Sequence, residues 1–424
     1  MGPLDREQAT EVTETLQSRL VDRLAADVPV DRRSVLGGLG TLGGAAMAGR
    51  AFAHDGDDHE EEATHQHGNF GPKGEFNRTA FDPHEFLTAF NTGEDGQDIV
   101  PQRRYEEDGR TVREFDLTAT DVTIEVAPGV DFPVDAWAFN GQVPGPTLRV
   151  VEGDLVRITF SNASKHAHTI HPHLINTDPV MDGVPQNGPG VIDPGEEFTY
   201  EWVAQPAGVH FYHCHAVPLK AHIHRGLYGM IIVDPDPERV REHPREYVNY
   251  HGPMTDAYVD ELVDVARTRN HEYPEQDAVN ELVMMMNGFD INFDEDNEIY
   301  AVNTRAFAYG IGSTDGKGSW EPGETMHPIR IDRNELQRVY LVNATEFDPI
   351  NSFHSHSQFF DYYDHGTTLY PTLKNVDTIM QCQAQRGIIE LDYSEHEPGL
   401  YMFHAHQSEF AEQGWMSFFE VTDG

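Results

Sequence analysis

The sequence predicts an all-β protein with two sandwich domains, and three features of the chain support this prediction. Residues 115–235 contain short alternating segments separated by Pro and Gly turns, which is typical of a β-sandwich or small barrel. Residues 248–424 are again rich in strand-like segments. Each block carries one histidine pair early and another just before its last strand, so the two blocks form a weak repeat at the scale of a domain.

The strand candidates follow one another at short intervals, because Pro and Gly turns break each block into brief runs. In the first block they are residues 122–126, 148–151, 155–160, 198–202, 209–212 and 229–233. In the second block they are residues 338–342, 387–391 and 415–421. Residues 255–269 have a helical pattern and are predicted to be an insertion near the start of the second domain. We expect the first domain to span residues 112–236 and the second residues 245–424.

The N-terminus indicates an export signal in residues 1–53. Arg32 and Arg33 precede a stretch of Gly, Ala and Leu, and Ala51-Phe-Ala53 follows ahead of an acidic segment, which is typical of the twin-arginine route. The stretch is too short and glycine-rich for a membrane span. The signal predicts an extracellular, cell-surface or periplasmic location; the alternative is a disordered N-terminus with a chance Arg pair. Residues 54–111 are expected to form an acidic linker and N-terminal extension that contains His54, His59, His65 and His67.

The chain is strongly acidic, with 72 Asp and Glu against 29 Lys and Arg and a formal net charge of −43. Such a charge repels nucleic acids and anionic membranes and therefore argues against both as partners. The acidic residues are spread along the whole chain, which is typical of the solvated surface of a halophilic protein. The alternative is an acidic patch that recruits cations.

The two cysteines, Cys214 and Cys382, are too few for a disulfide framework. Cys214 stands in His213-Cys214-His215, and on an extended strand the cysteine points to one face and both imidazoles to the other. The thiolate can therefore bind one copper while the imidazoles bind a copper pair, and electrons can pass between the two sites through a few covalent bonds. Cys382 is predicted to be a small, buried hydrophobic residue.

Four histidine pairs stand at corresponding positions of the two blocks, and one pair encloses Cys214. They are His171 and His173, His213 and His215, His354 and His356, and His404 and His406. Imidazole suits copper in either oxidation state. Eight imidazoles are also enough to hold three copper ions. A structural zinc takes four ligands with cysteine among them, so zinc fits the pattern poorly.

Longer motifs in the first block match a known pattern. Met181-Asp182-Gly-Val-Pro is followed by Pro194-Gly-Glu-Glu-Phe-Thr-Tyr and by Gly208-Val-His-Phe-Tyr-His-Cys-His. With these motifs and the histidine pairs, residues 115–424 resemble the multicopper oxidases, the laccase-like family built of cupredoxin domains. The resemblance implies two cupredoxin-like Greek-key β-sandwich domains and the two-domain subgroup with type 1 copper in domain 1. It also implies about four copper ions per chain, one type 1, one type 2 and two type 3.

The resemblance implies a role for each ligand. In the family, the first histidine of a His-x-x-His-x-His run binds the type 1 copper, which gives His168; Cys214 and His222 complete the site, with Leu227 as a non-ligating axial residue. His224 is the rival of His222, because the spacing from Cys214 is longer than usual, as if residues were inserted around 217–220. The cluster ligands are His171 and His354 for the type 2 copper and His173, His213, His215, His356, His404 and His406 for the type 3 coppers.

The second block has lost the type 1 positions of the family pattern, where Asn351, Ala405, Phe410 and Trp415 stand. Its histidines are therefore predicted only to complete a trinuclear cluster. In the two-domain subgroup, that cluster forms between domain 1 of one subunit and domain 2 of its neighbour. The resemblance thus implies an obligate homotrimer with intersubunit trinuclear clusters.

The resemblance further implies an oxidase that takes single electrons from a phenolic or aromatic compound or a metal ion, and reduces O2 to water with four electrons. Asp182, at the family's acidic position, and Glu409 are the candidate proton donors. A copper-containing nitrite reductase is the alternative enzyme, because it shares the trimer and the two domains. A copper-binding or electron-carrier protein without turnover is the second alternative. The Met-Met-Met run at residues 284–286 is expected to pack in the core rather than to bind Cu(I).

Overall fold

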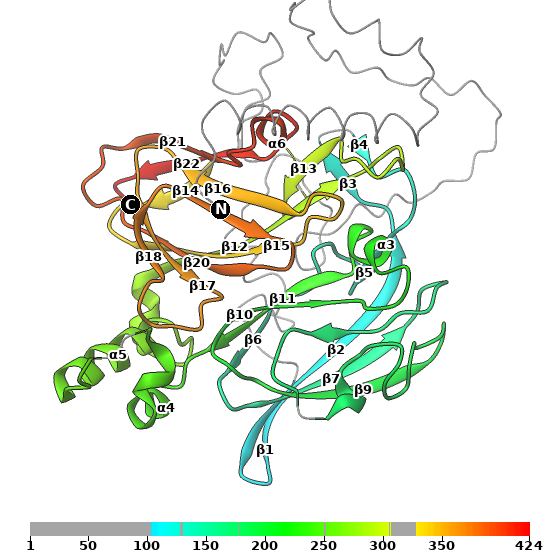
Figure 1. Ribbon diagram of the computed structural model, residues 1–424, viewed down its shortest axis with the longest axis horizontal. Coiled ribbons are helices and arrows are strands. Elements are labelled where there is room, and N and C mark those ends of the chain that lie inside the picture. The colour runs from blue at the N-terminus through cyan, green and yellow to red at the C-terminus, as the bar shows by residue number, and fades with distance from the viewer. Residues whose placement is uncertain (1–102, 128–129, 177, 250–251, 305, 307–327) are drawn as a thin grey trace, which may run out of the picture. The chain divides into compact units, whose positions relative to one another are not determined.

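A computed structural model describes residues 103–127, 130–176, 178–249, 252–304, 306 and 328–424. The expected export signal in residues 1–53 and residues 54–102 of the expected linker lie outside these described residues. Within them, the chain forms four main β-sheets and a small two-stranded sheet, with few helices (Figure 1). The predicted all-β fold class is therefore confirmed.

The first domain is built on two main sheets (Figure 1). One has the strand order β1 (Arg103–Glu107), β2 (Arg110–Val122), β7 (Leu155–Asn162) and β9 (Glu197–Val203), with β5 (Ala136–Phe139) also paired to β2. The other has the order β6 (Leu148–Val151), β11 (Tyr228–Asp234), β10 (Gly208–His213) and β8 (His171–Pro172). The single strand predicted at residues 122–126 is wrong. Strand β2, which pairs with β5, ends at Val122. The next strand is β3 (Glu125–Ala127), which pairs with β4 (Val130–Asp131).

The second domain repeats the two-sheet plan. One sheet has the order β13 (Ile299–Val302), β12 (Val279–Phe289), β15 (Leu336–Asn343), β20 (Arg386–Leu391), β17 (Phe360–Asp364) and β18 (Leu373–Val376). The other has the order β14 (Ile329–Asp332), β22 (Met416–Thr422), β21 (Gly399–His404), β16 (Ile350–Ser355) and β19 (Thr378–Cys382). In both domains, strands that carry the histidine motifs are therefore neighbours in one sheet: β8 with β10, and β16 with β21.

The described helices are short. They are α3 (Leu219–His224), α4 (Pro237–Glu242), α5 (Asp256–Thr268) and α6 (Ser408–Glu412), with 3-10 turns at Pro179–Met181, Pro244–Tyr247 and Pro274–Ala278. The predicted helical insertion is confirmed as α5, whose first turn is capped by the Thr255 hydroxyl. Its buried side, Leu262, Val263 and Ala266, joins Val240 of α4 in a small core of its own. No helix in the described ranges is long and apolar enough to cross a membrane.

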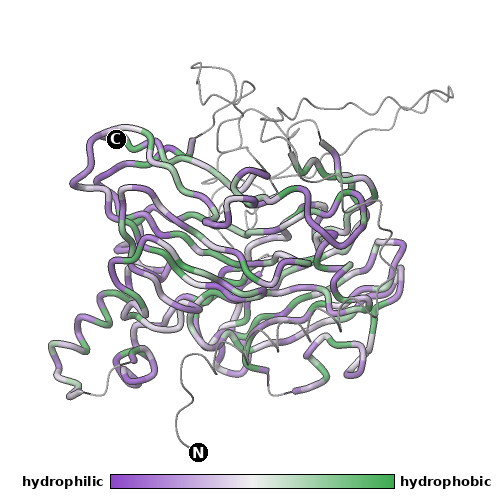
Figure 2. Tube along the Cα trace, turned by 45° about the horizontal axis from the view of Figure 1, so that its top comes forward, coloured by the Kyte–Doolittle hydropathy of each residue, from purple (hydrophilic) through white to green (hydrophobic). Residues whose placement is uncertain are grey.

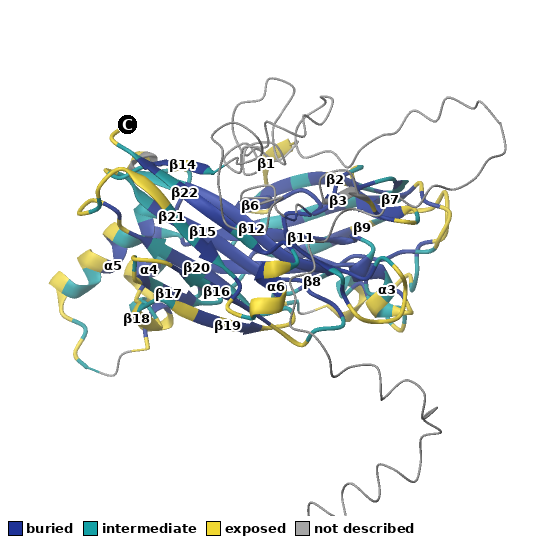
Figure 3. Cartoon of the chain, turned by 90° about the horizontal axis from the view of Figure 1, so that it is seen from above, coloured by how far each residue is buried: buried dark blue, intermediate teal, exposed yellow. Residues whose placement is uncertain are grey.

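Alternation of apolar residues explains the sheets. In β7 every second side chain is buried, and Val156, Ile158 and Phe160 point into the core of the first domain. Hydrophilic and hydrophobic residues accordingly alternate along the strands in Figure 2, and Figure 3 shows mostly buried strands beside helices with exposed faces. Because successive residues of a strand point to opposite faces, burial of the apolar residues determines the direction of the polar residues between them.

Strands β10 and β11 are buried on both faces. Val209, Phe211 and Met230 belong to a large core that also contains strand β12 of the second domain, whereas Tyr212 and Cys214 belong to the core of the first domain. The methionines at residues 284–286 lie in the large core and are at most 1% exposed. Their predicted packing role is therefore confirmed, and this core joins the two domains of one chain.

A buried ion network joins the same two domains. Arg149 of β6 is 1% exposed and contacts Asp234 of β11, with a nitrogen–oxygen distance of 3.0 Å. The other end of its guanidinium binds both carboxylate oxygens of Glu281 on β12. Glu281 also accepts a hydrogen bond from the Tyr340 hydroxyl. Burial pushes the pKa of Asp234 upward, but Arg149 and His271 more than offset this, and the pKa lies below its usual value.

Candidate metal centres

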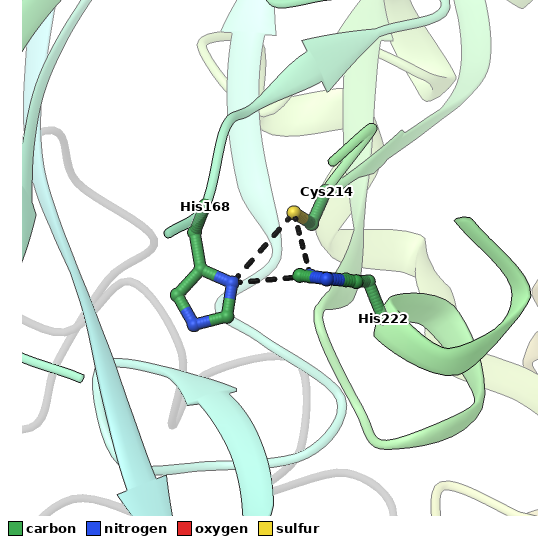
Figure 4. Close-up of side chains that lie close together, drawn as sticks. All are labelled: His168, Cys214 and His222. Carbon is green, nitrogen blue, oxygen red and sulfur yellow. Dashed lines mark hydrogen bonds between the residues drawn. The ribbon is translucent and has the colours of Figure 1, made fainter. Parts of the chain in front are cut away.

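Three ligand side chains converge beside the end of β10 (Figure 4). Cys214 follows the strand, His168 comes from the segment before β8, and His222 lies on α3. The Cys214 sulfur is 3.2 Å from Nδ1 of His222 and 3.8 Å from Nδ1 of His168, and the two Nδ1 atoms are 3.1 Å apart. The Ser164 hydroxyl bonds Nε2 of His168, so that Nδ1 of this ring faces the sulfur. A thiol and two imidazoles with their donor atoms turned inward fit a copper ion.

The electrostatics of this triad also suit a cation. Burial, followed by the neighbouring rings, lowers the pKa of His168 to about 3, and burial lowers that of His222 to about 4. Both imidazoles are therefore neutral at physiological pH and can act as ligands. Burial raises the pKa of Cys214 to about 11. The thiol keeps its proton unless a cation displaces it, so that metal binding here releases a proton.

Residues beside the triad shape it further. Gly226 has φ 118°, and a Cβ there would lie 2.5 Å from Val143 and 2.8 Å from the Trp137 carbonyl oxygen. The glycine therefore permits the tight return from α3 to β11. Leu227, which is fully buried, pairs its carbonyl with the Cys214 amide. The Trp137 ring lies 4.6 Å from the His222 ring and is itself only 6% exposed.

His224 lies away from Cys214. Its Nε2 accepts a hydrogen bond from the Asp290 amide at 2.9 Å, and its ring packs against Phe132 and Phe347. The residue is buried, because α3 turns its side chain into the core. Of the two rival ligands, the structure brings His222 to the sulfur.

The first histidine set consists of His171, His173, His213 and His215. Donor atoms of the first three lie within 4.8 Å of one another, and Nε2 of His173 is 3.2 Å from Nε2 of His213. Nδ1 of His171 donates to the Asp182 carbonyl at 2.7 Å, and Nδ1 of His213 donates to the Cys214 carbonyl at 2.9 Å. These bonds leave both Nε2 atoms free to act as ligands. The His215 ring lies 5.3 Å from that of His171.

The second histidine set, His354, His356, His404 and His406, repeats this geometry in the second domain. Nδ1 of His354 donates to the Asp377 carbonyl at 2.8 Å, and Nδ1 of His404 donates to the Ala405 carbonyl at 2.6 Å. Nε2 of His356 is 3.0 Å from Nε2 of His404. The Asp377 carbonyl therefore plays the part in the second set that the Asp182 carbonyl plays in the first.

The two sets do not meet within one chain. Among the described residues, every ring contact between two of these histidines, and every group of converging ligands that contains them, stays within one set. Each set offers four imidazoles, too few for three copper ions.

The residues predicted to stand at lost type 1 positions of the second domain make contacts of their own. Trp415 donates from its indole nitrogen to the Asn351 side chain at 3.1 Å. Ala405 is fully buried, and the Phe410 ring stacks on Tyr300 with centroids 3.8 Å apart. Packing and one buried hydrogen bond therefore hold these residues, and none of the four is a histidine or a cysteine.

The two candidate acids differ in placement. The Asp182 carboxylate lies 3.5 Å from Nδ1 of His171, at the edge of the first set. Glu409 is exposed in the first turn of α6. Cys382, which was expected to be buried, is exposed on β19, because its side chain lies on the outward face of an edge strand. Both cysteines are free.

Comparison with known proteins agrees with this geometry. Residues 118–238 and 290–424, together more than half of the chain, match family models described as multicopper oxidase. A crystal structure of a multicopper oxidase is 41% identical, covers 81% of this chain and 98% of its own, and superposes with a TM-score of 0.61. A multicopper oxidase of Cercospora beticola is 34% identical over 35% of this chain, and a copper-containing nitrite reductase of Neisseria gonorrhoeae is 31% identical over 28%. This chain spans 23% and 29% of the length of these two relatives. The chain belongs to the multicopper oxidase family.

Proposed function

We propose that the protein couples the one-electron oxidation of a donor to the four-electron reduction of O2 to water. The observation that carries this proposal is the placement of His213-Cys214-His215. The Cys214 thiol lies in the triad, while the flanking imidazoles lie in the first histidine set. The covalent bonds between Cys214 and its two neighbouring histidines therefore connect the triad, proposed to transfer one electron at a time, with the histidine set, proposed to use several electrons.

Copper supplies two kinds of chemistry when it is bound here: single-electron transfer at the triad and O2 reduction at a trinuclear cluster. We assign the type 1 copper to His168, Cys214 and His222. The Leu227 side chain has no ligand atom, so a copper held by these three residues would keep three protein ligands and would have a raised reduction potential. We assign the type 2 copper to His171 and His354, and the type 3 coppers to the six other histidines of the two sets, His173, His213, His215, His356, His404 and His406. This gives about four copper ions per chain.

We further propose that the cluster forms between two chains of a homotrimer. The separation of the two histidine sets in one chain supports this, because each set then meets the complementary set of a neighbour. In that arrangement Asp182 lies beside the type 2 ligand His171 and is a candidate proton donor. Glu409, three residues beyond His406, is the second candidate.

The donor is proposed to be a phenolic or aromatic compound or a metal ion. Trp137 covers the triad, and the three proposed ligands, His168, Cys214 and His222, are each at most 4% exposed. Electrons therefore enter without direct contact between donor and copper. We also propose that residues 1–53 direct export by the twin-arginine route. The acidic surface is proposed to suit a saline environment.

A copper-containing nitrite reductase is the second candidate, because the Neisseria gonorrhoeae relative bears that name. That reaction needs one catalytic copper with three histidines. The present chain keeps two complete histidine pairs in each domain, which favours the trinuclear cluster. A copper carrier without turnover needs a single copper and has no use for the second set.

Copper analysis together with O2 uptake distinguishes these candidates. The proposed oxidase is expected to contain about four copper ions per chain and to consume O2. Two copper ions with nitrite consumption and no O2 uptake would establish the reductase, and copper binding without either activity would establish the carrier. Cys214→Ser is expected to abolish the blue colour and donor oxidation, while the cluster keeps its copper. Cys382→Ser is the matched control, because it removes the other free cysteine at an exposed position.

A further inference from the structure

The first histidine set lines a cavity of about 420 Å³, and part of its wall comes from the second domain. Helix α3 contributes Lys220, and the second domain contributes Glu346 and Gln383. Of the residues that line this cavity, Glu346 alone carries a carboxyl group. The cavity therefore contains one acid, and this acid lies outside the histidine motifs.

Glu346 lies in the loop between β15 and β16, and hydrogen bonds from side chains hold it in place. Its carbonyl accepts a hydrogen bond from the Asn297 side chain at 2.8 Å, and its carboxyl is bonded by the Gln383 side chain. The residue is only 7% exposed. Thr345, one position earlier, donates its amide to the Asn343 side chain at 3.0 Å. The backbone on both sides of the carboxyl is thus anchored by side chains, which fixes the direction of the acid.

The charges around Glu346 leave its carboxyl able to change protonation near neutral pH. Burial raises its pKa to about 7, and the Gln383 hydrogen bond and the Lys220 charge oppose this only in part. Lys220 itself is exposed and forms an ion pair with Glu295. The remaining titratable groups of the cavity are the four imidazoles of the first set. Such a pKa matches the requirement for a group that both accepts and releases protons at the working pH.

We propose that Glu346 carries protons from solvent into the cluster cavity during O2 reduction. The inference rests on the proposed oxidase function. One O2 takes up four electrons and four protons and gives two water molecules. Each proton that leaves the Glu346 carboxyl is replaced from water at the mouth of the cavity, where Lys220 and Gln383 are exposed. The residue comes from the second domain but serves the histidine set of the first domain in the same chain.

Glu346→Gln tests this role, because it keeps the shape and the hydrogen bond but cannot release a proton. The variant is expected to bind the full amount of copper and to be reduced by donor without O2 at the wild-type rate. Its reoxidation by O2 is expected to be slowed about 10- to 100-fold. The wild-type reoxidation rate is expected to fall as the pH rises through about 7, and the variant is expected to lack this dependence. Glu346→Asp, which keeps a carboxyl, is expected to recover part of the lost rate.

Glu152→Gln is the matched control. Glu152 is also a buried carboxyl whose pKa is raised by burial, and it is bonded by the Tyr247 hydroxyl outside the cavity. This variant is expected to keep the wild-type pH profile. Infrared difference spectra between about pH 6 and pH 8 give a readout that needs no turnover, since the carboxyl band that titrates near 7 should be absent from the Glu346→Gln protein.

The outcomes separate the two proposals. If the wild-type protein with full copper takes up no O2, the oxidase proposal fails. If it takes up O2, and Glu346→Gln reoxidises with the wild-type rate and pH profile, the proton-transfer role of Glu346 is overturned. An equal loss of rate in the Glu152→Gln control, or no recovery in Glu346→Asp, also overturns it.

Discussion

A subunit-complementation experiment tests whether two chains share each trinuclear cluster. One variant carries His171→Ala and His173→Ala, which destroys the first histidine set. The other carries His354→Ala and His356→Ala, which destroys the second set. Both variants keep the triad around Cys214, so each alone is expected to show blue colour without O2 uptake. The perturbed histidines are partly exposed, and their truncation leaves the buried cores intact.

The expected recovery follows from the arrangement of the two sets. In a head-to-tail ring, each cluster combines the first set of one chain with the second set of the next. When equal amounts of the variants assemble at random, an intact first set meets an intact second set at about one interface in four. Co-assembled protein is therefore expected to show about a quarter of the wild-type O2 uptake per chain.

The assay compares co-expressed variants with the same variants purified apart and mixed without subunit exchange. Only the co-expressed sample is expected to take up O2, and its copper content is expected to exceed that of either variant. If the co-expressed oligomer stays inactive while each variant keeps its fold and its blue colour, the two sets do not combine between chains. An active monomer of the wild-type protein would contradict the reasoning equally.

Two further predictions concern the triad and the domain interface. Leu227→Met is expected to place a thioether at the axial position and to lower the type 1 reduction potential, which spectroelectrochemical titration measures; an unchanged potential would remove Leu227 from that position. Arg149→Met is expected to destabilise the chain by about 3–5 kcal/mol, because Asp234 and Glu281 are left buried without their cation. Chemical denaturation measures this loss, and wild-type stability would show that the network adds nothing.

The strands and the grouping of ligands could be predicted from the sequence because both follow a short repeat. The alternation of apolar and polar residues predicted the strand around Val156, and the His-x-His spacing predicted two imidazoles on one face of a strand end. The choice between His222 and His224 was harder. Both lie on α3, where residues two positions apart point to roughly opposite sides of the helix. Only one can face Cys214, and the direction of the helix depends on packing against the second domain.

Other functional features depend on contacts between distant segments. Glu346 lies 131 positions beyond His215, yet both line one cavity. Trp137 covers a triad whose members come from three later segments. The exposure of Cys382 follows from the position of β19 at the edge of its sheet. None of these placements has a local pattern, because each results from how the sheets pack.

The contact between the two domains explains why the two histidine sets of one chain lie apart. Strands β10 and β11, which lead to the first histidine set, bury one face against β12 in a common core. Arg149 adds a buried link from β6 to Glu281 on that same strand. Bringing the second set onto the first set of its own chain would require both contacts to break, exposing a large apolar surface and three buried charges. A neighbouring chain can approach without that cost. Because a ligand that binds only the assembled form stabilises it by mass action, copper bound by both sets would strengthen the assembly, while the triad, complete within one domain, would not depend on it.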